Sequence, residues 1–252
     1  MDSERYNRQL KVIGSTGQIS LEQSSVFIVG CGGLGCPISL YLASSGVGQI
    51  TIIDDDIVSL SNLNRQVLFG EDDIGLPKVD VAKEKLLKIN SHVKVNGIND
   101  RLNEYNAMKY IHGHDLVIIG CDNLPTRYVI NDVCCKTQKP YINASVLGDE
   151  GSIIFFDIAH GCYQCLFPKP PTKNTIPLPE DTGVLGPLVG VIGTVTATMV
   201  IEILIGNKFN YINKLFTFDS QTLKMKELPF SKEDSCSSCS GKIKQDTKRI
   251  RV

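Results

Sequence analysis

The sequence has almost no net charge, and it contains no P-loop, no internal repeat and no secretion signal. Its 26 Lys and Arg residues nearly balance 27 Asp and Glu residues, for a formal net charge of −1. This charge gives no general attraction to nucleic acid or to an anionic membrane, and we expect neither as a partner. The first residues, MDSERYNRQL, lack the basic and then apolar pattern of a signal peptide, so we expect a cytoplasmic protein.

Strand-like and helix-like segments alternate through the first 150 residues. This alternation is typical of an α/β fold of the Rossmann-like, doubly wound kind, with a mostly parallel sheet. After Gly148 two segments predict antiparallel strands that extend this sheet. The predicted strands cover residues 25–29, 49–56, 93–99, 115–121, 140–146, 151–159 and 214–230, and the predicted helices cover residues 3–14, 17–25, 34–45, 78–89, 103–111, 123–137 and 187–206.

The apolar segment at residues 187–206 is long enough to span a membrane. It contains three threonines and Glu202, so we expect instead a helix in the core or at a subunit interface. No linker interrupts the chain, and the 252 residues fit one large domain, which we place at residues 1–240. The basic segment at residues 241–252 predicts a disordered, solvated tail.

Two C-x-x-C pairs account for four of the nine cysteines. Without a secretion signal, reduced thiols are expected rather than a disulfide framework. Cys162 and Cys165 form the first pair, and Cys236 and Cys239 form the second. Four thiolates complete the tetrahedral ligand set of a structural zinc site. We predict such a site; four unrelated thiols or a redox pair are the alternatives. The other cysteines are expected in the core.

The stretch IVGCGGLGCP places three glycines between a predicted strand and a predicted helix. Gly30, Gly32 and Gly35 match G-x-G-x-x-G, in which the glycines permit a tight turn, a close approach of backbone to phosphate, and packing of the helix on the strand. The helix N-terminus adds N–H groups that attract an anion. Asp54 ends the next strand, at the spacing of a ribose ligand. The pattern predicts nucleotide binding.

Three further features favour a triphosphate over NAD. Arg65, in SLSNLNRQ, offers a fork of donors for phosphate oxygens. Lys78 begins a helix where its charge can reach a phosphate, and Asp122 follows a strand at the ligand-binding edge of such sheets, where a carboxylate holds Mg²⁺. Taken singly, these residues are also explained as a surface ion pair, a solvated lysine and a helix N-cap. No catalytic His or Tyr–Lys pair supports the alternative of an NAD-dependent oxidoreductase.

Eight motifs in a fixed order carry a family resemblance: RYNRQ, GCGGLGC, DDDIVSLSNLNRQ, GLPKVD, CDN, CYQCLFP, GPLVGVIG and the second cysteine pair. On these motifs the chain resembles the E1-like ThiF/MoeB/HesA family, adenylyltransferases that activate ubiquitin-like sulfur-carrier proteins. The resemblance covers nearly everything from RYNRQ to CSSC. It implies ATP-dependent adenylation of the C-terminal glycine carboxylate of a carrier, with release of pyrophosphate, in sulfur transfer for thiamine or molybdopterin biosynthesis.

The resemblance also implies roles for residues at matching positions. Arg8 would enter the site of the partner subunit in a homodimer, Asp122 would bind Mg²⁺, and the four paired cysteines would bind zinc. Intact Arg8, Arg65, Lys78 and Asp122, which form the implied catalytic set, argue against a non-catalytic E1-like partner subunit. The implied nucleotide-binding set is Gly32, Gly33, Asp54, Asp56, Ser61, Asn62, Leu63, Asn64, Arg65, Gln66, Lys78, Asp122 and Asn123.

One position departs from the pattern of the family. Members that form a covalent sulfur link with their carrier place a cysteine in the Pro-rich loop, where this chain has Pro179. We also expect no sulfurtransferase domain after the second cysteine pair. We therefore expect adenylation alone. The partners would be a ThiS- or MoaD-like carrier ending in Gly-Gly and a separate sulfur donor such as a cysteine desulfurase.

Overall fold

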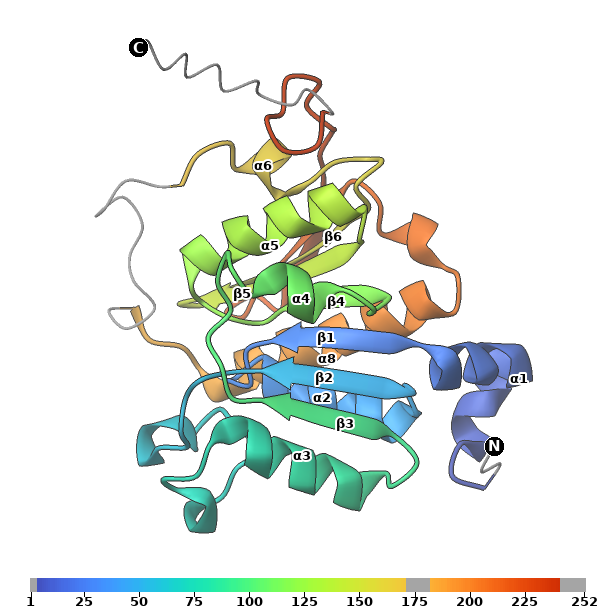
Figure 1. The fold of residues 1–252 in the computed structure, drawn as a ribbon, viewed down its shortest axis with the longest axis vertical. Coiled ribbons are helices and arrows are strands. Elements are labelled where there is room, and N and C mark those ends of the chain that lie inside the picture. The colour runs from blue at the N-terminus through green and yellow to red at the C-terminus, as the bar shows by residue number, and fades with distance from the viewer. Residues whose placement is uncertain (1–3, 171–181, 241–252) are drawn as a thin grey trace, which may run out of the picture.

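One eight-stranded sheet runs through residues 4–170 and 182–240, the parts of the chain that this computed structural model describes (Figure 1). The strand order is β3-β2-β1-β4-β5-β6-β7-β8, parallel from β3 to β5 and antiparallel from β5 to β8. The predicted mostly parallel sheet with an antiparallel extension is therefore confirmed. The strands are β1 (Ser25–Val29), β2 (Gln49–Ile53), β3 (Lys94–Ile98), β4 (Leu116–Ile119), β5 (Tyr141–Leu147), β6 (Glu150–Phe156), β7 (Lys214–Asp219) and β8 (Lys224–Pro229).

Helices cover both faces of the parallel strands. Successive side chains on a strand point to opposite faces, so one strand contributes to the core on each side. Val26 and Ile28 of β1 pack into the hydrophobic cluster formed with α2, α3 and α8, and Phe27 and Val29 pack into the cluster formed with α4 and α5. Burial on both faces explains why β1 is apolar throughout. The helices are α1 (Asn7–Gln23), α2 (Gly35–Ser45), α3 (Lys78–Ile89), α4 (Ala107–Ile111), α5 (Leu124–Thr137), α6 (Tyr163–Leu166) and α8 (Gly186–Leu204), with short 3₁₀ turns η1 (Leu60–Asn62), η2 (Glu71–Asp73) and η3 (Lys208–Asn210).

The register of the parallel strands brings their carboxyl ends level. Val29 of β1 lies opposite Ile53 of β2 on one side and Ile119 of β4 on the other. β2 and β4 end at these residues, earlier than the sequence suggested, because the parallel ladder ends there. Gly30, Asp54 and Gly120 therefore follow at one edge, where open α/β sheets bind their ligands.

The N-terminal helix α1 lies at the opposite end of the sheet, where β1 begins (Figure 1). Its backbone leaves the helical conformation at Gly14, where φ is +68°, as the two helices predicted on either side of residues 14–17 require. Tyr6, just before α1, is buried and accepts a hydrogen bond from Asn90 Nδ2 at 2.8 Å. Gln18 Nε2 donates to Ser45 O at 3.1 Å. These contacts fasten α1 to α2 and to the end of α3.

Helix α8 is the single described helix with the length and hydropathy of a membrane span. In the fold it packs against α2, β5 and β6. The approach to α2 is close, since a Cβ on Gly193 would lie 2.4 Å from Pro37 Cγ. The predicted packing of this helix against the core is confirmed, although Val191 and Thr198 are exposed.

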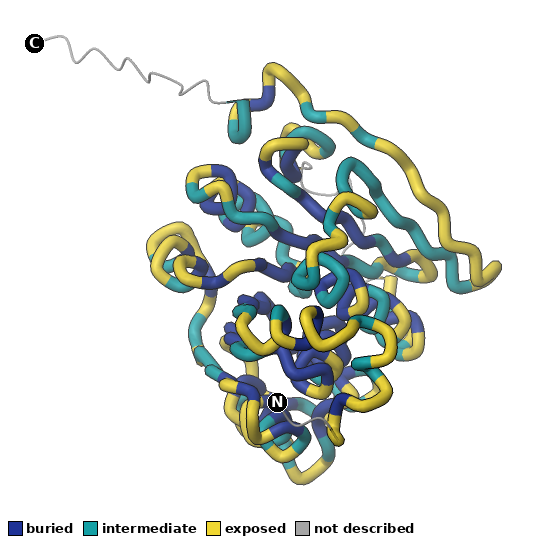
Figure 2. Tube along the Cα trace, turned by 90° about the vertical axis from the view of Figure 1, so that its right-hand side faces the viewer, coloured by how far each residue is buried: buried dark blue, intermediate teal, exposed yellow. Residues whose placement is uncertain are grey.

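The antiparallel end of the sheet is less covered than the parallel part (Figure 2). Every residue of β7 is half-buried and every residue of β8 is exposed, whereas β1 and β4 are almost entirely buried. The segment that follows β8 returns to α6, where the two cysteine pairs meet. Pro179 and the predicted tail at residues 241–252 lie outside the described residues.

Candidate functional site

A cavity of about 690 Å³ opens at the carboxyl ends of β1, β2 and β4. Its wall brings together residues from the glycine turn, from the loop before α3, from the start of α3 and from the loop before α5. These segments are far apart in the sequence. The sequence-predicted residues that line the cavity are Gly32, Gly33, Asp54, Asp56, Asn62, Asn64, Arg65, Gln66, Lys78, Asp122 and Asn123.

The glycine turn has the geometry that its three glycines predict. Gly30 has φ of +97°, in the left-handed region that favours glycine. A Cβ on Gly35 would lie 2.0 Å from Gly30 O, so only glycine permits α2 to begin this close to β1. Gly32 is different, because a Cβ there would stand 3.6 Å from Gln66 Nε2 at the cavity wall. The first and third glycines thus shape the turn, and the second leaves room beside it.

Asp54 is fixed against the glycine turn at the start of the cavity. Its Oδ2 accepts a hydrogen bond from Cys31 N at 2.6 Å, and its Oδ1 accepts one from Asp56 N at 2.9 Å. Burial raises the pKa of the Asp54 carboxyl above its usual value, and the two N–H donors oppose that shift. Each carboxylate oxygen retains a further lone pair. The carboxylate is therefore held rigidly and is able to accept hydroxyl groups of a ligand.

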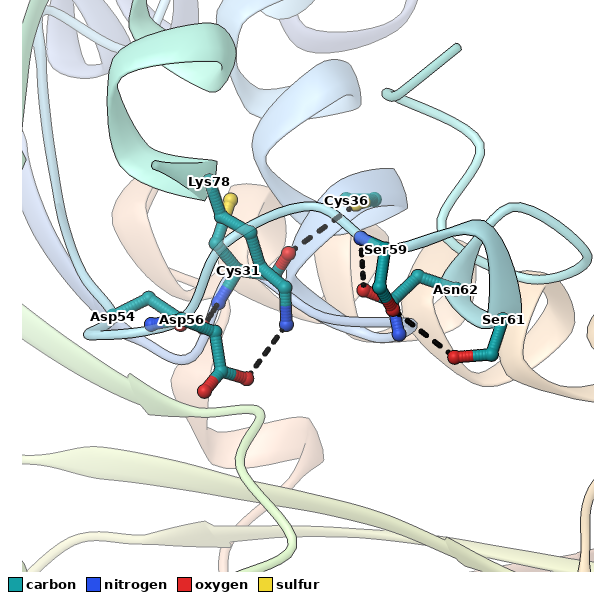
Figure 3. A network of polar contacts seen from close by, with 8 residues as sticks. All are labelled: Cys31, Cys36, Asp54, Asp56, Ser59, Ser61, Asn62 and Lys78. Carbon is teal, nitrogen blue, oxygen red and sulfur yellow. Dashed lines mark hydrogen bonds and ion pairs between the residues drawn. The ribbon is translucent and has the colours of Figure 1, made fainter. Parts of the chain in front are cut away.

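Lys78 reaches from the start of α3 into the same region (Figure 3). Its Nζ donates to Asp56 Oδ2 at 2.7 Å, and only 4% of its side chain is exposed, compared with 66% for Asp56. A buried ammonium needs an anionic partner, because desolvation of an unpaired charge is costly. The exposed carboxylate of Asp56 serves as that partner in this structure, and a phosphate would satisfy the same ammonium.

The loop before α3 holds the other predicted cation in a local hydrogen-bond pattern. Arg65 Nη1 donates to Ser61 O at 2.9 Å and to Asn64 Oδ1 at 3.0 Å. Asn62 Oδ1 accepts from Ser59 N at 3.1 Å, which closes a capping box around η1 (Figure 3). Asn62 thus shapes the loop as well as lining the cavity. The structure brings neither Ser61 nor Leu63 to the cavity wall.

Gln66 leaves an open hydrogen-bonding position beside the glycine turn. The residue is 4% exposed, and its Oε1 has no hydrogen-bond partner within the described residues. Buried polar atoms are nearly always paired in folded proteins. An unpaired one in a cavity wall, close to Gly32, fits a site that a polar ligand completes.

Asp122 and Asn123 follow β4, where a polar residue can either cap α5 or face the cavity. Asn123 caps α5, since its Oδ1 accepts hydrogen bonds from Thr126 N at 3.1 Å and from Thr126 Oγ1 at 3.2 Å. Asp122 is exposed and lines the cavity. The N-cap explanation for Asp122 is therefore wrong, and its carboxylate is available to a cation. Burial raises the pKa of neighbouring Cys121 to about 11, so this thiol is protonated at neutral pH.

Sequence reasoning missed six polar residues of the cavity wall: Asp55, Asp100, Arg101, Thr126, Arg127 and Ser145. Asp100 and Arg101 follow β3, so their position after a parallel strand was a usable signal. Ser145 lies within β5, and Arg127 lies in the first turn of α5, where nothing in the sequence distinguishes them from solvated residues. In the opposite direction, predicted Arg8 is exposed on α1 and is not part of this cavity.

The four paired cysteines form one cluster at the antiparallel end of the sheet. Their sulfur atoms all lie within 4.8 Å of one another. The Sγ–Sγ distance is 3.9 Å from Cys162 to Cys165, 3.6 Å from Cys162 to Cys236, and 3.5 Å from Cys165 to Cys239. A tetrahedron with metal–sulfur bonds of about 2.3 Å has edges of about 3.8 Å, whereas a disulfide requires about 2.05 Å. The cluster has the geometry of a tetrahedral metal site.

Fold and cavity together define a nucleotide-binding domain of the Rossmann type, with cations and an acidic residue around a glycine turn. The chain belongs to the ThiF family, whose model matches residues 6–239. Among curated relatives, the adenylyltransferase and sulfurtransferase MOCS3 of Culex quinquefasciatus is 42% identical over 240 residues, covering 94% of this chain and 55% of the relative. The protein of the same name from Xenopus laevis is 42% identical over 244 residues, covering 95% and 54%.

Solved structures with the same fold include the biosynthetic enzyme MccB. The structure of E. coli MccB with ATP has a TM-score of 0.82 and 29% identity, covering 95% of this chain and 75% of that one. The microcin C7 biosynthetic enzyme MccB in complex with N-formylated MccA has a TM-score of 0.84 and 28% identity, covering 94% and 75%. This chain spans about half the length of the curated relatives it matches.

Proposed function

We propose that this protein uses ATP to adenylate the C-terminal carboxylate of a small ubiquitin-like carrier protein, with release of pyrophosphate. The observation that carries the proposal is the arrangement of Arg65, Lys78 and Asp122 around one glycine-turn cavity. Membership of the ThiF family and the adenylyltransferase relatives support the same activity. A nicotinamide enzyme has no need of this set of charges at that position.

The reaction needs charge neutralisation and alignment more than proton transfer. A carboxylate is already a nucleophile at neutral pH, so its attack on the α-phosphate requires no general base. Lys78 and Arg65 would exchange their present oxygen partners for phosphate oxygens and stabilise charge on the departing pyrophosphate. Asp54 would accept the ribose hydroxyls, and Gln66 would donate its amide or accept at its unpaired Oε1.

Asp122 would be the protein ligand of Mg²⁺. Its carboxylate lines the cavity while Asn123 takes over the capping of α5. Mg²⁺ is typically bound through one or two carboxylates together with substrate phosphates and water. When bound, the ion would neutralise charge on the triphosphate, and the protein's contribution is to hold the Asp122 carboxylate where that triphosphate lies.

A homodimer would bring Arg8 to this reaction. Within one protomer Arg8 is exposed on α1, at the opposite end of the sheet from the cavity. The family resemblance implies that the matching arginine would enter the partner subunit's site. Val12 of α1 is 82% exposed, and Leu185 and Val191 at α8 are 67% and 37% exposed. Apolar side chains exposed on two helices support an interface between two copies.

The cysteine cluster would hold a structural zinc ion. Four thiolates at the edges of a tetrahedron leave no open coordination position, which is typical of structural rather than catalytic zinc. The sulfur donor would be a separate protein, the pathway would be thiamine or molybdopterin biosynthesis, and the compartment would be the cytoplasm, where thiols stay reduced.

ATP–pyrophosphate exchange with a panel of carriers ending in Gly-Gly tests the activity. Exchange that depends on one carrier and on Mg²⁺ is expected, and it would also identify the pathway. The variant that tests the site is Asp122→Asn, which preserves the size of the side chain. It should lose exchange and keep the melting temperature of wild type. ATP binding without exchange for any carrier, including an MccA-like peptide, would count against the proposal, and so would full exchange by Asp122→Asn.

A further inference from the structure

The connection between β4 and α5 carries Asp122, and the backbone fixes its first half. Gly120 N donates to Val29 O at 2.9 Å, which ties the start of the connection to β1. The next residue is equally close to the glycine turn, since a Cβ on Gly30 would lie 3.1 Å from Cys121 N. The position of Cys121 is therefore set by the sheet and not by its own side chain.

Two side chains of the α5 end fix the second half of the connection. Asn123 caps the helix through Thr126, as described above. Arg127, one turn further along α5, donates from Nη2 back to Cys121 O at 3.1 Å. Asp122 lies between these two restraints, and within the described residues no hydrogen bond or ion pair engages its carboxylate.

Asn and Asp are about equally good N-cap residues, so capping preference alone does not decide which of Asp122 and Asn123 begins α5. A shift of one residue would turn the Asp122 carboxylate from the cavity to the helix N-terminus, where the helix dipole also favours an anion. In the observed register, with Asn123 as the cap, Arg127 Nη2 donates to the carbonyl of Cys121. A bond from a charged donor is also stronger than one between neutral groups.

We propose that Arg127 is a positioning residue for Asp122, holding the carbonyl of Cys121 so that the Asp122 carboxylate faces the cavity and not the helix end. The proposal rests on the proposed function, because it assumes that the Asp122 carboxylate binds the Mg²⁺ that accompanies ATP. Lys is not equivalent to Arg here, since the planar fork of the guanidinium is preorganised, and an ammonium on a flexible stem is not.

A double-mutant cycle on nucleotide affinity tests this assignment without relying on turnover. ATP is titrated calorimetrically into wild type, Arg127→Met, Asp122→Asn and the double variant, once with excess Mg²⁺ and once with EDTA. Arg127→Met should weaken ATP binding about tenfold with Mg²⁺ and less than twofold with EDTA. In the Asp122→Asn background, Arg127→Met should change the affinity for ATP in the presence of Mg²⁺ less than twofold. Arg127→Lys should restore only part of the ATP affinity that Arg127→Met loses.

Lys136→Met is the matched control, because Lys136 is an exposed cation near the C-terminal end of the same helix, away from the cavity. It should leave the ATP affinity of wild type unchanged, both with Mg²⁺ and with EDTA. Equal losses for Arg127→Met with EDTA, or in the Asp122→Asn background, would overturn the proposal and show direct contact with the nucleotide. If Arg127→Met does not fold, Arg127→Lys carries the same cycle. Wild type that binds no ATP would refute the proposed function instead, without involving Arg127.

Discussion

Two glycines of the turn, Gly32 and Gly35, should respond in opposite ways to one added methyl group. In Gly35→Ala the new Cβ would lie 2.0 Å from Gly30 O, a backbone atom that cannot rotate away. In Gly32→Ala the new Cβ would lie 3.6 Å from Gln66 Nε2, which is an ordinary van der Waals contact. The first change therefore alters the fold of the turn, and the second alters only the space in the cavity.

The geometry sets the expected magnitudes. Relief of the contact in Gly35→Ala requires the start of α2 to move by about 1 Å, and overpacking of this kind costs up to about 3 kcal/mol. Alanine's better helix propensity returns about 1 kcal/mol, which leaves a net loss of about 2 kcal/mol. For a chain of this size that loss lowers the melting temperature by about 4–8 °C. Gly32→Ala should stay within about 0.5 kcal/mol of wild type.

The affinity for ATP should depend more strongly on Gly32 than the stability of the fold does. The methyl group of Gly32→Ala would occupy the space in which backbone approaches phosphate, and we expect at least about a tenfold loss of ATP affinity, or about 1.4 kcal/mol. Thermal melting and calorimetric titration of both variants provide the test. Wild-type ATP affinity in Gly32→Ala would show that phosphate does not bind at this turn, and an unchanged melt for Gly35→Ala would contradict the close contact of α2 with β1.

Three other perturbations follow from the cysteine cluster, from Lys78 and from a buried histidine. Removing metal with a chelator should lower the melting temperature by at least 10 °C and make four thiols reactive, because zinc in small finger peptides binds with about 10–16 kcal/mol; unchanged melting and thiol counts would exclude a structural metal. Lys78→Met should keep the fold but reduce exchange about 10²–10³-fold, since it removes a buried cation from the cavity; normal exchange would remove Lys78 from the mechanism. Burial lowers the pKa of His114, so its neutral form is favoured in the folded state. The stability it contributes is complete above the ordinary histidine pKa and is lost as pH falls below that value and through the lowered pKa of the folded state. The melting temperature should therefore fall less between pH 7.5 and 5.5 in His114→Gln than in wild type, and equal falls would refute this.

The hydrophobic patterns and the glycines between them were sufficient to predict the order of helices and strands. The β-branched strand at β1, the glycines around α2 and the alternation up to β5 predicted the doubly wound sheet, because each element's pattern depends mainly on its own burial. The break at Gly14 and the antiparallel extension were predicted for the same reason. The short elements η1, η2, η3 and α6 were missed, since three or four residues are too few to show a period.

Part of the cavity was predictable, from the ends of strands and from the motifs that contain Arg65 and Lys78. Asp54 and Asp122 were identified because parallel strands deliver their following residues to one edge. Arg127 was not, because its approach to Cys121 depends on how α5 is placed on the sheet, which no local pattern encodes. The choice of Asn123 over Asp122 as the cap of α5 was equally hidden, since both residues suit that position.

The two cysteine pairs lie 74 positions apart in the sequence, so they are synthesised at different times. Cys162 and Cys165 emerge well before Cys236 and Cys239, and the N-terminal parts of a chain fold first during synthesis. Every residue of the cavity wall precedes the second pair. Metal binding by all four thiols would therefore follow the synthesis of every residue of the cavity wall. A chain made without zinc would contain every residue of the cavity wall, whereas the segment after β8 would lack its metal link to Cys162 and Cys165.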